Sequence, residues 1–300
     1  MNRKEFIKNL GILTAGVTLP SIPSWGADNE RLVILHTNDW HSHIESFSMN
    51  HKKYPGMGGA SKRASYIQEI KSKYKHVLVL DSGDIFQGTP YFNFFGGELE
   101  FKLMSAMGYD FATLGNHDFD LGIDALSHQL KNAKFKFLNS NYNFQNTPLK
   151  NKIENYAIVK KGNFKIGILG VGIELNGLVP KNLYGNIKYE EPIKKANQVA
   201  KYLKSEGCNI VICLSHLGFK YNSDKVSDVK LAQNSTHIDL ILGGHTHTFM
   251  NNPREFANKK GKNVLINQTG WAGIFMGRID YEINNSEGLS LLNNSFKKIS

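Results

Sequence analysis

The sequence predicts an α/β fold, in which strands buried on both faces alternate with helices. Apolar, β-branched runs recur along the chain, and most are hydrophobic at consecutive positions. Such continuous hydrophobicity is typical of strands that are covered on both sides. Helical patterns lie between the runs, and this alternation favours a sheet flanked by helices. The predicted strands are 31–37, 76–82, 110–116, 164–171, 208–216, 238–244 and 262–268.

The segments between these strands have the spacing of helices. The predicted helices are 60–73, 98–107, 122–133 and 190–206. Glu191-Pro192 suits the start of the last one, because proline is favoured in the first helical turn. The tail segments 274–283 and 289–296 alternate polar and apolar residues, which predicts antiparallel strands. No repeat or shift in composition interrupts residues 30–300, so we expect one domain.

The N-terminus differs from the rest of the chain. It has a basic start with Arg3, Lys4 and Lys8, an apolar run over 10–19 and small residues up to Ala27. This order predicts a signal peptide over 1–27, a mature chain over 28–300 and a periplasmic or secreted location. The start resembles a twin-arginine export motif with lysine in the second position, so the export route stays open. The apolar run is too short to span a bilayer, so we expect no stable membrane anchor.

The net charge and the two cysteines indicate which partners and which covalent links to expect. The net charge of +10 favours anionic substrates. The lysines are scattered, without a basic helix that carries interleaved aromatic residues, so we expect no nucleic-acid partner. Cys208 and Cys213 lie five residues apart on one predicted strand, which puts their side chains on opposite faces and argues against a mutual disulfide.

Polar residues concentrate where the predicted strands end. Aspartate, asparagine or histidine follows five of the strands. In open α/β sheets the carboxyl ends of parallel strands form the usual site, so five loops would deliver these groups to one edge. Each residue alone has a plain structural explanation. Asp84 could cap the next helix and Asp39 could form an Asx turn. The joint arrangement is harder to explain in that way.

Carboxylate and imidazole groups together suit divalent metals such as Mn, Zn or Fe. Seven candidate ligands are too many for one ion and enough for two that share a bridging carboxylate. Two neighbouring ions suit phosphoryl transfer, because they can hold both the attacking and the leaving oxygen. The candidates are Asp39, His41, Asp84, Asn116, His216, His245 and His247.

The order D-x-H, G-D, G-N-H-D, H and G-H-x-H resembles that of the calcineurin-like metallophosphoesterase superfamily. The segments ILHTNDWHSHIE, DSGDIFQGTP, ATLGNHDFDLG, FLNSNY and GGHTHTF resemble its secreted 5′-nucleotidase and UDP-sugar hydrolase branch, over about residues 31–280. The resemblance implies a four-layer αββα sandwich of two mixed sheets flanked by helices. It also implies one metal on Asp39, His41, Asp84 and His247, and a second on Asp84, Asn116, His216 and His245.

The same resemblance implies that His117 is the catalytic imidazole and is paired with Asp120. Asn116 can ligate a metal through its carbonyl oxygen and donate its amide to a phosphate oxygen, so Asn116 and His117 are also the expected substrate contacts. Asp120 can orient the imidazole ring and raise its pKa. Asp118 either caps the helix that starts near Gly122 or supports the site from behind.

The resemblance implies hydrolysis of phosphate esters with two divalent ions (Mn, Zn, Fe, Mg or Ca), of the 5′-nucleotidase kind. UDP-sugars, cyclic phosphodiesters and sulfur esters stay open as alternatives. Family members usually continue into a C-terminal domain that contacts the nucleoside, whereas this sequence stops at Ser300. We therefore expect that domain to be absent. A split enzyme that needs a separate chain carrying it is a further alternative.

Overall fold

Two six-stranded mixed sheets form the centre of the computed structural model, which describes residues 30–284 and 288–300. The first sheet has the order β14-β13-β1-β2-β3-β4. Its four strands β1 to β4 are parallel, and β13 and β14 extend it as an antiparallel pair. The bounds are β1 Glu30–Thr37, β2 His76–Asp81, β3 Phe111–Ala112, β4 Lys136–Phe137, β13 Phe275–Asn284 and β14 Gly288–Lys298.

The second sheet has the order β11-β12-β10-β9-β7-β6. Its inner strands are parallel, and the edge strands β6 and β11 run antiparallel to their neighbours. A separate two-stranded pair joins β5 (Tyr142–Asn143) to β8 (Lys188–Tyr189). The bounds are β6 Tyr156–Lys161, β7 Phe164–Gly172, β9 Ile210–His216, β10 Leu240–Gly243, β11 Arg254–Ala257 and β12 Asn263–Asn267.

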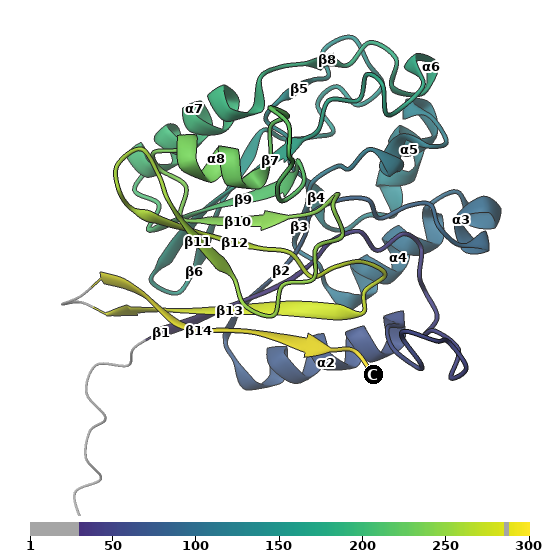
Figure 1. The fold of residues 1–300 in the computed structure, drawn as a ribbon, viewed down its shortest axis with the longest axis horizontal. Coiled ribbons are helices and arrows are strands. Elements are labelled where there is room, and N and C mark those ends of the chain that lie inside the picture. The colour runs from purple at the N-terminus through teal and green to yellow at the C-terminus, as the bar shows by residue number, and fades with distance from the viewer. Residues whose placement is uncertain (1–29, 285–287) are drawn as a thin grey trace, which may run out of the picture.

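Helices lie on the outer faces of both sheets (Figure 1). Residues of α2, α4 and α5 pack on the first sheet, whereas residues of α7 and α8 pack on the second. The α-helices are α2 Ala60–Lys73, α3 Pro90–Phe95, α4 Glu98–Met107, α5 Ile123–Gln129, α6 Lys181–Tyr184, α7 Pro192–Ser205 and α8 Asp228–Asn234. Short 3₁₀ turns cover His117–Phe119 and Leu130–Asn132.

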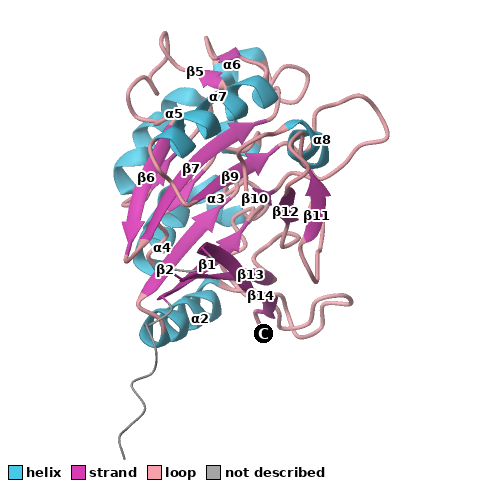
Figure 2. Cartoon of the chain, turned by 90° about the vertical axis from the view of Figure 1, so that its left-hand side faces the viewer, coloured by secondary structure: helices cyan, strands magenta, loops and turns pink. Residues whose placement is uncertain are grey.

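The packing confirms that the central strands are buried on both faces. In β1, Leu32 and Ile34 pack into the core between the sheets, and Val33 and Leu35 pack under the helices. Neighbouring side chains of a strand point to opposite faces, so the central part of a strand in this position is apolar at consecutive residues. The result is the expected four-layer αββα sandwich, whose two sheets are seen from the side in Figure 2.

The element predictions hold best where the periodicity is long. Helices α2 and α4 coincide with 60–73 and 98–107, and the tail forms the expected antiparallel pair. The strand predicted over 110–116 is wrong in length, because β3 ends at Ala112 and the following residues form a loop. The helix predicted over 122–133 is divided into α5 and a 3₁₀ turn. The sequence analysis did not predict α3, α8 or the edge strand β6.

Three further predictions concern the N-terminus, membrane anchoring and the two cysteines. The predicted signal peptide, 1–27, lies outside the described residues. In the part that the structure describes, no helix is long and apolar enough to cross a membrane. Cys208 and Cys213 are both free and buried, which confirms that they do not pair with each other.

Candidate metal and phosphoester site

The predicted site residues come together at one edge of the molecule. The parallel strands β1, β2 and β3 of the first sheet and β9 and β10 of the second end there. Asp39, Asp84, Asn116 and His245 lie in the loops that follow four of these strands, while His216 is the last residue of β9. Both sheets therefore contribute to one site between their carboxyl ends.

Asp39, His41 and His247 form the first group of possible ligands, with one side-chain atom of each lying within 4.8 Å of the others. The Nε2 atoms of His41 and His247 are 3.0 Å apart. Asp39 Oδ1 lies 3.3 Å from His247 Nε2 and 3.9 Å from His41 Nε2. These atoms lie close enough to one another to bind one ion.

Asp84, His216 and His245 form the second group by the same measure. Asp84 Oδ2 lies 3.0 Å from His216 Nε2 and 3.9 Å from His41 Nε2, so this carboxylate stands between the two groups. Asn116 Oδ1 lies 2.8 Å from His245 Nδ1, which adds an amide oxygen to the second group. All seven predicted ligands are thus in these two adjoining groups.

The hydrogen bonds of the imidazoles fit metal binding. The Nδ1 atom of His41 donates to the backbone carbonyls of Phe86 and Gln87. The Nδ1 atom of His216 donates to the backbone carbonyl of Ser82. With Nδ1 protonated, Nε2 of each neutral ring carries a lone pair. The buried Nε2 of His216 has no hydrogen-bond partner among the described residues, although it faces Asp84. A cation would fit between these two atoms, in place of the Nε2 proton that otherwise pairs His216 with Asp84.

Burial and the two carboxylates set the charges of the site. Burial lowers the pKa of His41 and of His245, to about 4 for His245, and Asp84 and Asp39 only partly oppose it. Burial would also lower the pKa of His216, but the adjacent Asp84 outweighs it and raises that pKa to about 10. Burial alone would raise the pKa of Asp84, yet His216 holds it below its usual range. The pair therefore favours an ionised carboxylate.

Backbone strain is concentrated in the ligand loops. Nine non-glycine residues have a left-handed φ within the described chain, and five of them are predicted ligands. Such conformations cost about 1–3 kcal/mol each and persist where the surroundings enforce them, often at functional sites. The five are Asp39 (φ 50°), His41 (φ 52°), Asp84 (φ 53°), His245 (φ 72°) and His247 (φ 49°).

Asp118 supports the Asp84 loop from behind. Its carboxylate accepts hydrogen bonds from the backbone N–H groups of Gly115, Asp84, Ile85 and Phe86, at 2.8 to 3.3 Å. Its side chain does not cap α5, because the N-cap residue of that helix is Gly122 and the bonds of Asp118 go to the loop instead. Of the two roles left open by the sequence, the geometry therefore favours support of the site.

The remaining alternatives are also resolved by local contacts. Asp84 does not cap the next helix, α3, whose N-cap is Thr89. Asp39 accepts from the backbone N–H of His245 and from Asn38 Nδ2. Gly115 has an ordinary φ but lies so close to Asp84 that a Cβ would stand 2.2 Å from Oδ1. Close approach, rather than a left-handed turn, therefore requires glycine there.

His117 and Asp120 lie beside the two groups. The Nδ1 atom of His117 is 2.8 Å from Asp120 Oδ2, and the imidazole is 38% exposed. The bond to Asp120 raises the pKa of His117, against the opposing effect of burial. The backbone N–H of His117 donates to Asp84 Oδ1 at 2.8 Å, which ties this residue to the second group. The ring is thus near the possible ions and open to solvent.

The loop after β12 contributes residues that the sequence analysis missed. Trp271 stacks on His247, with ring centroids 5.8 Å apart and planes within 7°. Thr269 donates to Asn38 Oδ1 through both its backbone N–H and its hydroxyl, at 2.8 Å. Gln268 bonds to the turn that carries His245 and His247. The segment QTGW directly after the strand β12 is the signal that marks this loop.

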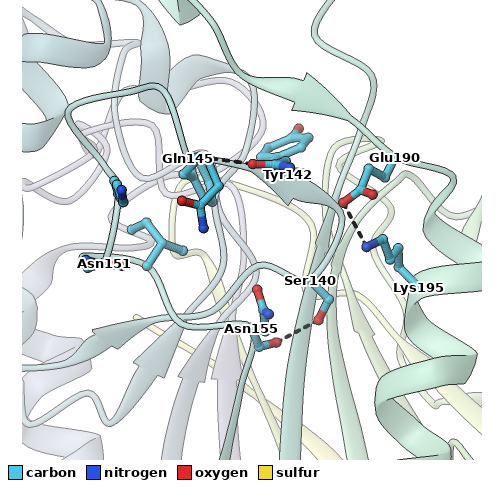
Figure 3. A pocket seen from close by; sticks show the side chains of 11 residues that line it. Ser140, Tyr142, Gln145, Asn151, Asn155, Glu190 and Lys195 are labelled. Carbon is cyan, nitrogen blue, oxygen red and sulfur yellow. Dashed lines mark hydrogen bonds and ion pairs between the residues drawn. The ribbon is translucent and has the colours of Figure 1, made fainter.

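A polar cavity of about 320 Å³ lies between the segment after β4 and the start of α7 (Figure 3). Its lining includes Tyr142, Asn155 and the ion pair Lys195–Glu190, which measures 2.8 Å. The Tyr142 ring packs edge-on against Phe119, two residues after His117. None of the predicted site residues lines this cavity.

The site can now be compared with known proteins. Residues 32–249 match the family described as calcineurin-like phosphoesterase. The chain belongs to this family. Calcineurin-like phosphoesterases use a dimetal site, and the two groups of ligands give this chain a matching arrangement.

Individual relatives are longer than this chain. A snake venom 5′-nucleotidase from Crotalus adamanteus is 34% identical over 246 residues, which cover 80% of this chain and 41% of the venom protein. An NAD 5′-nucleotidase from Haemophilus influenzae is 33% identical over 262 residues, which cover 80% and 42%. The crystal structure of a 5′-nucleotidase precursor from Thermus thermophilus has a TM-score of 0.78 and 29% identity, covering 89% of this chain and 54% of the other.

Proposed function

We propose that this phosphoesterase is a metal-dependent phosphomonoesterase of the 5′-nucleotidase kind. The observation that carries the proposal is the position of Asp84 between two ligand groups, with His117 beside them. In the proposed assignment, one ion takes Asp39, His41, Asp84 and His247. The other takes Asp84, Asn116, His216 and His245.

Two divalent ions bound there would supply Lewis acidity for an attacking water and neutralise charge on the phosphoryl group. The amide of Asn116 can donate to a phosphate oxygen while its carbonyl oxygen faces His245. His117, protonated, stabilises charge on the phosphoryl group or gives its proton to the leaving oxygen. Asp120 holds the ring through Nδ1, which leaves Nε2 for that proton transfer.

A nucleotide is the proposed substrate, because the named relatives are 5′-nucleotidases. Mn²⁺ or Zn²⁺ suits the mixture of imidazole, carboxylate and amide ligands. The relatives extend well beyond the matched region, so we also propose that a further polypeptide segment, on this or on a separate chain, contacts the nucleoside. Action in the periplasm or outside the cell follows from the predicted signal peptide.

A panel of substrates tests this function. The protein should be assayed with Mn²⁺, Zn²⁺ and Mg²⁺ on p-nitrophenyl phosphate, bis-p-nitrophenyl phosphate, AMP, NAD and a UDP-sugar. We expect turnover of the monoesters, with AMP preferred if the nucleoside is recognised by this chain alone. Full occupancy by metal without hydrolysis of any of the five would refute the enzymatic proposal.

A further inference from the structure

Gln268 makes four hydrogen bonds from a fully buried position in the loop after β12. Its Nε2 donates to Asp228 Oδ2 and to the Gly244 carbonyl, both at 2.9 Å. Its Oε1 accepts from the Thr246 hydroxyl and from the Thr248 backbone N–H, both at 3.2 Å. A side-chain amide has two donors and an oxygen with two acceptor positions, so its capacity is fully used.

Three of these bonds fasten one turn, the segment from Gly244 to Thr248. This turn carries His245 and His247, which have left-handed φ values of 72° and 49°. Those conformations are costly for non-glycine residues, so contacts elsewhere must enforce them. The two histidines belong to different ligand groups, and the turn therefore takes part in both.

The fourth bond leads to a second anchor. Asp228, also fully buried, accepts from Gln268 through Oδ2 and from the Ser215 hydroxyl through Oδ1, at 2.6 Å. Ser215 directly precedes His216, the strand-borne ligand of the second group. Gly243 leaves room for this carboxylate, because a Cβ there would stand 2.1 Å from Asp228 Oδ2. A continuous set of bonds thus joins the segments of three candidate ligands.

We propose that Gln268 is a positioning residue that sets the affinity of both metal positions through the turn from Gly244 to Thr248. The inference rests on the proposed dimetal function, but it concerns binding of the ions and not the chemistry. Residues that orient metal ligands from behind typically change metal affinity about 10- to 100-fold when replaced.

The chemistry of the site requires an amide at this position. In Gln268→Glu the shape is nearly unchanged, but a carboxylate oxygen would replace the donor that faces Asp228 and the Gly244 carbonyl. With both carboxyl groups ionised these contacts would be repulsive, and a single proton taken up by the buried pair would satisfy only one of the two acceptors, so the turn should move away from its present position. A purely space-filling role would tolerate this change.

The test is a titration of metal-free protein with Mn²⁺ and with Zn²⁺ by calorimetry, reading the dissociation constant of each of two sites. Asn197→Asp is the control, because the Asn197 amide makes three hydrogen bonds of the same kinds but joins α7 to the end of α8, away from the site. We expect Gln268→Glu to weaken both sites by about 10- to 100-fold. The control should lower stability and leave both constants unchanged.

Two unchanged constants in a folded Gln268→Glu protein would overturn the proposal. If that variant does not fold, Thr246→Ala removes the hydroxyl that bonds to Gln268, to the Phe219 backbone N–H and to the Thr248 hydroxyl, whereas Thr246→Ser keeps it. We expect a smaller weakening of both sites in the alanine variant alone, and unchanged affinity there would also overturn the proposal. Wild-type protein that binds two ions but hydrolyses no phosphoester would refute the proposed function alone, since the constants would still report on Gln268.

Discussion

His117 Nδ1 lies 2.8 Å from Asp120 Oδ2, and the ring belongs to neither group of metal ligands. Replacing His117 by alanine should therefore leave the metal content near that of the wild type. Turnover should fall about 10²- to 10⁴-fold, which is the usual contribution of a general acid or base. Steady-state kinetics together with elemental analysis of the same sample measures both quantities. Loss of metal from this variant would show that His117 is a ligand and that its proposed role is wrong.

Replacing Gly115 by alanine tests the close packing against Asp84, because it adds a single methyl group there. In Gly115→Ala the new Cβ would stand 2.2 Å from Asp84 Oδ1 and 2.4 Å from its backbone nitrogen, so the Asp84 loop must shift. We expect weaker metal binding and a loss of about 1–3 kcal/mol in the free energy of unfolding.

Gly261→Ala is the control for that variant, because it adds strain at a left-handed φ of 71° in open space far from any predicted ligand. It should lower stability by about 1 kcal/mol and keep normal metal affinity. Metal titration and denaturant unfolding separate the two effects. Equal metal affinity in both variants would contradict the proposed importance of the Gly115–Asp84 contact.

Asp118→Ala removes the acceptor of four backbone N–H groups around Asp84. Buried donors without partners are costly, so we expect a loss of about 2–4 kcal/mol in stability and weaker binding at both metal positions. Asp124→Ala, at an exposed position in the first turn of α5, should change neither. Thermal unfolding with and without Mn²⁺ gives the measurement. An Asp118→Ala protein as stable as the wild type would contradict the support that we assign to this carboxylate.

His36 gives the protein a predictable response to acid. The ring is fully buried in β1, and burial lowers its pKa from 6.5 to about 3. Between these values the unfolded chain binds one more proton than the native protein, so the free energy of unfolding falls as the pH drops. The slope from this group is about 1.4 kcal/mol per pH unit.

His36→Gln should remove that part of the acid sensitivity. Between pH 4 and pH 6.5 the free energy of unfolding, measured with denaturant, should fall less steeply for the variant. The difference in slope should correspond to roughly one proton. Parallel curves for the two proteins would mean that His36 titrates normally and is not buried as described.

That the predicted ligands lie together could be foreseen, because the loops after parallel strands meet in space whatever their separation in sequence. Asp39 and His245 are 206 residues apart, yet the backbone N–H of His245 donates to Asp39. The sequence shows that each of the two residues follows an apolar strand, and the carboxyl ends of such strands lie at the same edge of the fold. The double-sided burial of β1 could be predicted from the sequence itself, since Leu32 to Leu35 are apolar at four consecutive positions.

The parts that escaped prediction depend on tertiary contacts. Nothing in the local pattern at Ala112 shows that β3 ends there, because Leu114 continues the apolar run and is itself buried. The left-handed φ of Asp84 and the role of Asp118 come from bonds between separate loops. Gln268 lies in a loop with no charged or imidazole side chain, so its chemistry gave no reason to include it in the site.

The central claim is that Asp84 joins two metal positions, and counting bound ions tests it most directly. Metal-free wild-type protein titrated with Mn²⁺ should bind two equivalents and give the electron paramagnetic resonance signal of a spin-coupled pair. Asp84→Ala should lose binding at both positions, while circular dichroism shows a folded protein. A wild-type protein that binds a single uncoupled ion, or an Asp84→Ala variant that still holds two, would contradict the account.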